Sequence, residues 1–164
     1  MEQLSIVIIT LNEEKRIGRL LENLSQQTYK NFEVIVVDSN SDDATCDVAN
    51  AYSNALPKLT VHKMAGRGTS LGRNTGAELA QYERILFLDA DVQLRANFLQ
   101  DAMMQLEEKK LEVAGVFMGA NGLPLIHKLG YGLFNVGLYL TQFFFPTAVG
   151  ACIFSTKRVH KEIG

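Results

Sequence analysis

The chain has 164 residues, 47% of them hydrophobic and 21% charged, and its formal net charge is −2. This composition indicates one globular domain rather than a disordered segment, and the scattered Lys and Arg residues argue against a nucleic-acid partner. Its two cysteines, Cys46 and Cys152, are far apart, and the N-terminus lacks the basic start and cleavage site of a secretory signal. We therefore expect reduced thiols in a cytoplasmic protein.

The first predicted strand is Leu4–Thr10, a continuous apolar run rich in β-branched residues. Such runs are typical of strands buried on both faces of a parallel sheet. Asn12 is a candidate N-cap, and the two acids after it suit the positive end of a helix. The predicted helix then carries four apolar side chains at helical spacing, Ile17, Leu20, Leu21 and Leu24.

The second buried strand is Phe32–Val37, and it ends at Asp38. The polar turn Ser39–Asp43 follows, and Ala44–Tyr52 is a plausible helix. Ser and Asp are favoured N-cap residues, so we expect Ser41–Asp43 to have a structural role.

A third strand is predicted over Leu59–His62, and a glycine-rich loop opens at Gly66–Gly68. Leu71–Gln81 can be helical. A fourth strand, Ile85–Leu88, runs into the acidic triplet Asp89-Ala90-Asp91. An acid-rich end to an apolar strand is a candidate ligand site, because ligands of α/β sheets bind beyond the carboxyl ends of the strands.

The last regular elements of this part are an amphipathic helix over Asn97–Lys109 and a fifth strand over Val113–Met118. Strand and helix alternate along the chain, which predicts an α/β fold with a mostly parallel sheet. Polar residues then meet at one edge of that sheet, where each strand ends.

Asp89 and Asp91 are two residues apart, so in extended backbone their side chains point to the same side. Two such carboxylates repel each other unless a cation or hydrogen-bond donors compensate, and their oxygens suit Mg²⁺ or Mn²⁺. The alternative is a solvated turn in which Asp91 caps a local helix. Asp38 can accept hydrogen bonds from a ribose hydroxyl or a base N–H, or it can bond its own turn.

The stretch Gly66–Gly76 is neither a P-loop nor a dinucleotide fingerprint, because the required residues and spacing are missing. Arg67 and Arg73 could reach a diphosphate, although Arg67 can equally be a solvated loop charge. Arg73 and Asn74 lie near a helix start, where backbone N–H groups also favour anions. The histidines are isolated from other metal ligands, so we assign them no metal or catalytic role. The cysteines are interpreted as small apolar residues. Glu162, near the end of the sequence, is interpreted as a surface helix residue.

From Leu123 to Phe154 the sequence is strongly apolar. Leu129–Phe145 is at the lower length limit for crossing a bilayer, so we expect a buried or interfacial helix. Two interpretations of the apolar stretch remain open. It can belong to the core or to a homodimer interface, or it can serve a lipid-linked acceptor or a membrane surface.

Four segments in this order, SIVIITLNEE, VIVVDSNSDDAT, GRNTGA and ILFLDADV, resemble the inverting glycosyltransferases of family 2. The resemblance implies a GT-A fold, a Rossmann-like three-layer sandwich with a mostly parallel central sheet, over a single domain of residues 1–164. Residues 1–118 would bind the nucleotide sugar, and residues 119–164 would be the apolar, incomplete start of the acceptor-side region.

The resemblance also implies roles for individual residues. The segment Thr10, Leu11, Asn12 and Glu13 would lie against the base and ribose, and Asp38 would bind the base, commonly uracil or guanine. Arg73 and Asn74 match the family's Arg-Asn pair, and Asp89, Ala90 and Asp91 match its DxD motif, which holds the ribose and, with Mn²⁺ or Mg²⁺, the diphosphate. Ser39-Asn40 departs from the more frequent Asp-Gly. The general base would lie beyond Gly164, so no convincing catalytic base is present and the fragment is expected to transfer sugar poorly.

The expected function is therefore metal-dependent, inverting transfer of a sugar from a UDP- or GDP-linked donor to a glycan or lipid-linked acceptor. The expected location is the cytoplasm, including the inner face of the membrane. One alternative is a nucleotidyltransferase, although the first strand is not followed by the glycine-rich basic loop of that class. The other is a non-catalytic module that binds nucleotide sugar or docks on a membrane.

Overall fold

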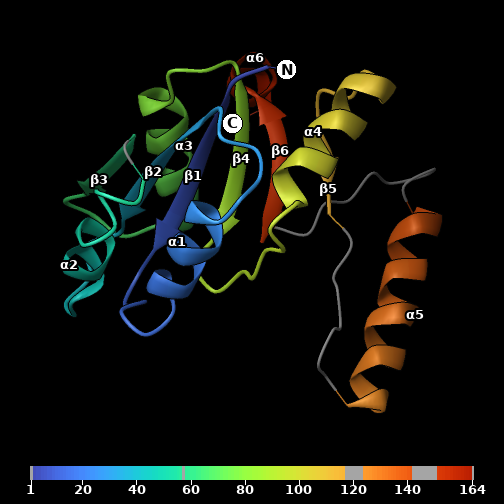
Figure 1. The fold of residues 1–164 in the computed structure, drawn as a ribbon, viewed down its shortest axis with the longest axis horizontal. Coiled ribbons are helices and arrows are strands. Elements are labelled where there is room, and N and C mark those ends of the chain that lie inside the picture. Colours follow the sequence, from blue (N-terminus) through green and yellow to red (C-terminus); the bar gives the residue numbers. More distant parts are fainter. Residues whose placement is uncertain (1, 57, 117–123, 142–150, 164) are drawn as a thin grey trace.

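The computed structural model describes residues 2–56, 58–116, 124–141 and 151–163. Within these residues the strands form one sheet in the order β3-β2-β1-β4-β6-β5 (Figure 1). The strands are β1 (Leu4–Thr10), β2 (Phe32–Asp38), β3 (Leu59–Lys63), β4 (Arg84–Asp89), β5 (Ala114–Gly115) and β6 (Cys152–Thr156). The helices are α1 (Ile17–Ser25), α2 (Thr45–Asn50), α3 (Thr69–Leu79), α4 (Phe98–Lys109), α5 (Leu125–Thr141) and α6 (Lys157–Ile163).

The sheet is mostly parallel, as the alternation of elements predicts. β1 pairs in parallel with β2 and β4, and β2 pairs in parallel with β3. β6 runs antiparallel to both β4 and β5. The carboxyl ends of the four parallel strands therefore share one edge, and the residues after them are candidates for a common site.

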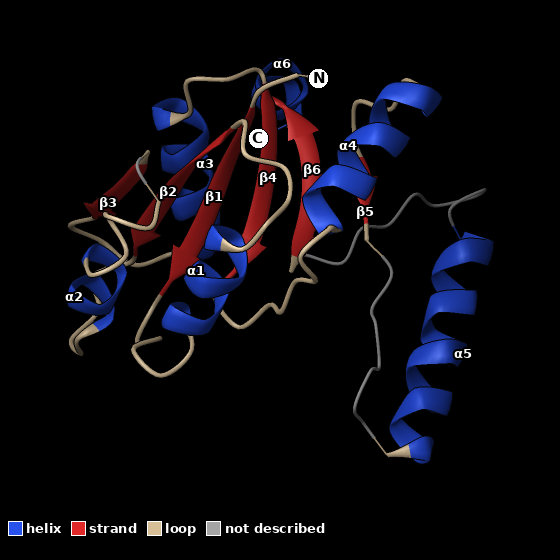
Figure 2. Ribbon diagram, viewed as in Figure 1, coloured by secondary structure: helices blue, strands red, loops and turns tan. Residues whose placement is uncertain are grey.

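Helices cover both faces of the sheet, which gives the three layers (Figure 2). Ile6 and Ile8 of β1 pack with residues of α1, α2 and α4, whereas Val7 and Ile9 lie in the core beneath α3. α3 lies very close to β1: a Cβ placed on Gly76 would be 2.2 Å from Cγ1 of Val7. Any side chain at this position would push α3 off the sheet, so glycine sets the helix–sheet spacing.

Three local predictions are wrong or incomplete. Asn12 does not cap α1, because the chain turns through residues 13–16 first and α1 begins at Ile17, with Arg16 as an N-cap that makes no side-chain bond. β5 is only Ala114–Gly115, since it pairs with just two residues of β6; Phe117 and Met118 lie outside the described residues. β6 and α6 were not predicted as elements.

α5 overlaps the predicted helix Leu129–Phe145 but begins earlier, at Leu125. Gln142–Phe145 lie outside the described residues. Most side chains of α5 in the described part are exposed. Of the two predicted alternatives, a buried or an interfacial helix, the buried one does not hold for these residues, and the interfacial one stays a prediction. None of the helices in the described ranges is long and apolar enough to cross a membrane.

Candidate functional site

Asp38 and Asp89 lie at the same edge of the sheet, on either side of β1. Asp38 is the register partner of Thr10, and Asp89 is the partner of Ile9. Two strand spacings, about 10 Å, therefore separate their backbones. The two side chains belong to opposite faces, because Asp38 continues the face of Val36 and Asp89 continues the face of Phe87. A ligand that contacts both regions must lie across the tip of β1.

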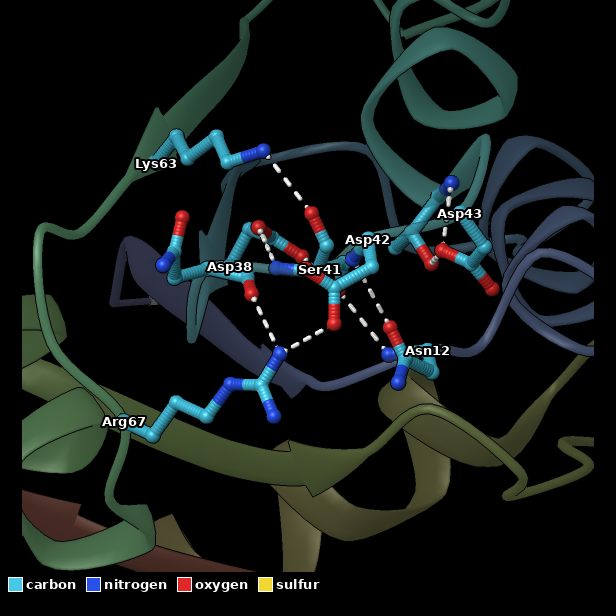
Figure 3. Close-up of polar contacts among 9 residues, drawn as sticks. Asn12, Asp38, Ser41, Asp42, Asp43, Lys63 and Arg67 are labelled. Atoms are coloured by element: carbon cyan, nitrogen blue, oxygen red, sulfur yellow. Dashed lines mark hydrogen bonds and ion pairs between the residues drawn. The ribbon is translucent and has the colours of Figure 1, made fainter.

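The carboxylate of Asp38 is fully buried and accepts several hydrogen bonds (Figure 3). One oxygen accepts from the Thr10 hydroxyl at 3.0 Å and from the Ser41 hydroxyl at 2.5 Å, and the other accepts from the Ser41 N–H at 2.8 Å. The thiol of Cys46 lies nearby and helps to lower the pKa of this carboxyl. Two carboxylate oxygens offer about four acceptor positions, so this network encloses Asp38. Its predicted contact with a base stays a prediction.

These hydrogen bonds keep Asp38 ionised. Burial alone raises the pKa of this carboxyl, but the donors from Ser41, Thr10 and Cys46 outweigh it, and the pKa of Asp38 lies below its ordinary value of 3.8. The opposite shift affects the neighbouring thiol: burial, and then the charge of Asp38, raise the pKa of Cys46. Cys46 is therefore a protonated thiol beside the Asp38 carboxylate.

The residues after β1 are held against the turn that follows β2. The Asn12 N–H donates to the Ser41 hydroxyl, and the Asp42 N–H donates to the Asn12 side chain, both at 2.9 Å. The Glu13 N–H donates to Thr45 at 2.8 Å. Leu11, at the tip of β1, is 41% exposed. The segment Thr10–Glu13 thus has a fixed backbone and one exposed apolar side chain at the sheet edge.

The turn after Asp38 contains Asn40 with a φ of 60°. This left-handed conformation is the one that glycine adopts most easily, and Asn is among the few other residues that tolerate it. The change from Asp-Gly to Ser-Asn therefore still permits a glycine-type turn. Lys63 donates to the Ser41 carbonyl at 2.9 Å, and Arg67 donates to the Asn40 carbonyl at 3.3 Å (Figure 3).

Arg67 also forms an ion pair with Asp42, and both side chains are at least half exposed. Exposed pairs of this kind contribute little to stability, so the guanidinium can be released to another anion at small cost. Asp43 has the predicted structural role, since its carboxylate accepts from the N–H groups of Thr45 at 3.0 Å and Glu14 at 3.2 Å. It is not the N-cap of α2, however, because that position is Ala44, which makes no side-chain cap bond.

The acidic triplet after β4 forms the second part of the edge. Arg73, in the second turn of α3, approaches Asp89 with an N···O distance of 3.6 Å. Ala90 is buried in the core, whereas Asp91 is exposed. Partial burial raises the pKa of Asp89, Arg73 lowers it, and the charges of Asp91 and Glu13 raise it, so the net shift is upward from 3.8. Three carboxylates therefore share one electrostatic neighbourhood with one arginine.

A divalent cation fits this cluster chemically. Its donors are carboxylate oxygens, which Mg²⁺ and Mn²⁺ prefer. The pKa of Asp89 is raised first by partial burial and also by the charges of Asp91 and Glu13, and a nearby cation would favour the ionised carboxylate. In the described part of the chain no three His, Cys, Asp or Glu side chains converge as a complete metal site. Asp89 and Asp91 would thus hold a metal only together with oxygens from a ligand, such as a diphosphate.

His160 of α6 lies beside Asn74 of α3, with Nε2 3.0 Å from the Asn74 side-chain oxygen. Because that oxygen can only accept, Nε2 donates. The ring packs against Phe87, with centroids 5.0 Å apart. Burial, and then the charge of Arg73, lower the pKa of His160, so the ring is neutral at neutral pH. The chain end thereby supports the Arg73–Asn74 pair.

Sequence reasoning missed three contributors to this edge: Cys46, Lys63 and His160. Each is separated in sequence from the residue that it supports, and none belongs to a motif. Only the strand order brings α6 beside α3, since β6 was not predicted. A hollow lined by Leu24, Phe32 and Leu56 lies at the other end of β2 and takes no part in the site.

Comparisons with known proteins show the family of this chain. A family model described as glycosyl transferase family 2 matches residues 5–161. The poly(ribitol-phosphate) β-N-acetylglucosaminyltransferase TarS of Staphylococcus aureus is 33% identical over 126 residues, covering 74% of this chain and 22% of TarS. The glycosyltransferase GlyG of Streptococcus pneumoniae is 28% identical over 113 residues, covering 68% of this chain and 38% of GlyG. The chain thus spans well under half the length of these curated relatives.

Solved structures give the same result. A TarS fragment in complex with UDP has a TM-score of 0.67 at 33% identity, covering 75% of this chain and 38% of that one. The mannosyltransferase PcManGT of Pyrobaculum calidifontis, in complex with GDP-Man and Mn²⁺, has a TM-score of 0.81 over 99% of this chain and 47% of that one. At 21% identity the second likeness shows the fold alone. The expected GT-A fold is confirmed.

Proposed function

Because this chain belongs to glycosyl transferase family 2, we propose that it binds a UDP- or GDP-linked sugar across the tip of β1 and transfers the sugar to an acceptor hydroxyl. The observation that carries the proposal is the single sheet edge that joins two regions. One is the fixed backbone around Thr10–Glu13 and Asp38, and the other is the acidic cluster of Asp89 and Asp91 with Arg73.

In the proposed binding mode the base and ribose lie against the exposed Leu11 and the backbone held by Asn12 and Ser41. Asp38 acts beneath them as a positioning residue, since its oxygens are occupied by donors from the protein. The diphosphate lies on the side of Asp89 and Asp91. Arg73 and Arg67 approach from α3 and the preceding loop, and both can donate to phosphate oxygens.

The proposed reaction is a direct displacement. A lone pair of the acceptor oxygen forms a bond to the anomeric carbon as the bond to the diphosphate oxygen breaks, so the configuration inverts. Negative charge grows on the departing nucleoside diphosphate, and Arg73 is placed to stabilise it. A divalent cation, when bound at Asp89 and Asp91, supplies further positive charge for the same purpose. The acceptor proton passes to a general base.

Calorimetric titration of the 164-residue chain with UDP and with GDP, each with and without Mn²⁺, tests the binding half of the proposal. We expect heat with one of the two nucleotides and a marked gain in affinity with Mn²⁺. Absence of heat with both nucleotides under both conditions would overturn it. Pyrophosphate release from a nucleoside triphosphate would instead indicate nucleotidyl transfer.

A further inference from the structure

α5 presents an aliphatic stripe to solvent. Its members recur at helical spacing, so they lie along one face, and each is between 54% and 76% exposed. They are Leu125, Ile126, Leu129, Leu133, Val136 and Leu140. Single exposed apolar residues need no explanation, but six on one face of one helix mark an interaction surface.

The other side of α5 is the more protected one. Tyr131, Asn135 and Leu138 are half-buried, and they lie across the helix from Leu129 and Leu133. The aliphatic stripe is therefore the more exposed side of α5.

The charged residues near α5 in the sequence indicate which kind of surface can cover the stripe. The chain has 18 Asp and Glu residues, yet none lies between residues 113 and 161. The basic side chains of α5 are His127 and Lys128, and both are exposed. Lys128 and the half-exposed Tyr139 lie at the margin of the stripe, where a cation and an amphipathic ring can reach lipid headgroups.

We propose that α5 lies in the plane of an anionic lipid surface, with the stripe among the acyl chains and Lys128 at the headgroups. At 17 residues the described helix is shorter than is usual for a span. A second copy of the chain is the other candidate occupant. Stable dimers use about 20–30 residues on each side, however, whereas the stripe offers only six. The proposal does not depend on the proposed sugar transfer.

Co-sedimentation of the 164-residue chain with vesicles of phosphatidylcholine, with and without phosphatidylglycerol, tests this inference. We expect binding to the mixed vesicles, weaker binding to the neutral ones, and roughly tenfold weaker binding to the mixed vesicles when Leu129→Glu and Leu133→Glu are combined, because apolar burial and charge attraction both fall. The matched control combines Leu79→Glu and Met104→Glu, which place the same charges on exposed apolar positions of α3 and α4. The control is expected to bind like the unchanged chain.

Three results would overturn the inference. The first is failure of the unchanged chain to sediment with either vesicle, and the second is a loss of vesicle binding in the control variant equal to that in the stripe variant. A third is a dimer in velocity sedimentation that the stripe variant alone abolishes, since this would assign the stripe to a second copy. Circular dichroism melting and the nucleotide titration check that the stripe variant is folded. Loss of nucleotide binding by the unchanged chain would count against the proposed function and not against the lipid surface.

Discussion

The acidic residues that end β2 and β4 have opposite surroundings. At the end of β2, Asp38 is enclosed by donors and its pKa is lowered. At the end of β4, Asp89 is half-exposed and lies 3.6 Å from one arginine. Its partial burial, together with the charges of two other carboxylates, outweighs that arginine and raises its pKa. The hydrogen bonds of Asp38 are satisfied within the protein, whereas the ionised form of Asp89 would be stabilised by an added positive charge. The same sheet edge thus carries one rigid acidic residue and one that favours binding of a cation.

The largest effect should come from removing the carboxylates that would hold the metal. We expect Asp89→Asn and Asp91→Asn each to lower nucleotide affinity in the presence of Mn²⁺ by about a hundredfold, or roughly 2.7 kcal/mol, because a ligand oxygen charge is lost. Affinity without Mn²⁺ should change little. Calorimetry measures both, with Glu108→Gln on α4 as control. An equal loss with and without Mn²⁺ would show that these residues do not act through a cation.

The second effect concerns stability rather than binding. Asp38→Asn replaces an acceptor by a donor opposite the Ser41 N–H, and we expect the free energy of unfolding to fall by about 2 kcal/mol, the cost of an unmet buried polar group. Urea denaturation measures it, and the exposed Asp101→Asn serves as the matched control.

The pH dependence of that difference follows from the lowered pKa of Asp38. The stabilisation is fully present above the ordinary value of 3.8 and is lost as pH falls through the lower folded-state pKa. The gap between the unchanged chain and Asp38→Asn should therefore be flat from neutral pH down to the ordinary value and narrow below it. A gap that narrows well above that value would contradict the assignment.

A smaller effect is expected at His160. His160→Leu removes the donor to Asn74, and we expect nucleotide affinity to fall about fivefold, near the 1 kcal/mol of one hydrogen bond. His160→Gln, which keeps an N–H donor, should recover most of it. In an Asn74→Ala background His160→Leu should have no further effect. Equal losses in both backgrounds would show that His160 does not act through Asn74.

The smallest expected effect is on thermal stability, and it tests the difference between Asp38 and Asp89. Since the folded-state pKa of Asp89 is raised, the ionised group opposes folding as pH rises through that pKa. Asp89→Asn should therefore raise the melting temperature without ligand at neutral pH, by about 1 °C because solvent screens a partly exposed group. A fall would indicate that the Arg73 ion pair outweighs the repulsion.

The parallel part of the fold could be predicted because its strands are continuous apolar runs and each ends in polar residues. Val34–Val37 and Ile85–Leu88 need no tertiary information to be recognised as buried strands. β6 could not be distinguished in the sequence from the apolar stretch before it, because an apolar segment such as Cys152–Phe154 is compatible with a strand, a helix or an interface. Its antiparallel pairing with β4 depends on partners 64 or more residues earlier in the chain.

The residues of the site also divide into those that the sequence predicts and those that depend on the tertiary structure. Asp38, Asp89 and Asp91 were predicted from their places at strand ends. The sequence does not show that Asp38 and Asp89 belong to opposite faces of the sheet, because this depends on the register of β2 and β4 against β1. Nor does it show that Cys46 and Ser41 enclose Asp38, since those contacts require the turn at Asn40 to fold back.

The pairing of Gly115 with Ile153 has a consequence for how such proteins can diverge. The chain leaves the sheet after Gly115, and Ile153 of β6 pairs beside that point, about 5 Å away. The two ends of the segment that carries α5 are therefore held together by the sheet. Because the entropy of closing a loop changes only slowly with its length, we expect changes in the length of this segment to cost little stability while the edge formed by β1, β2 and β4 keeps its shape.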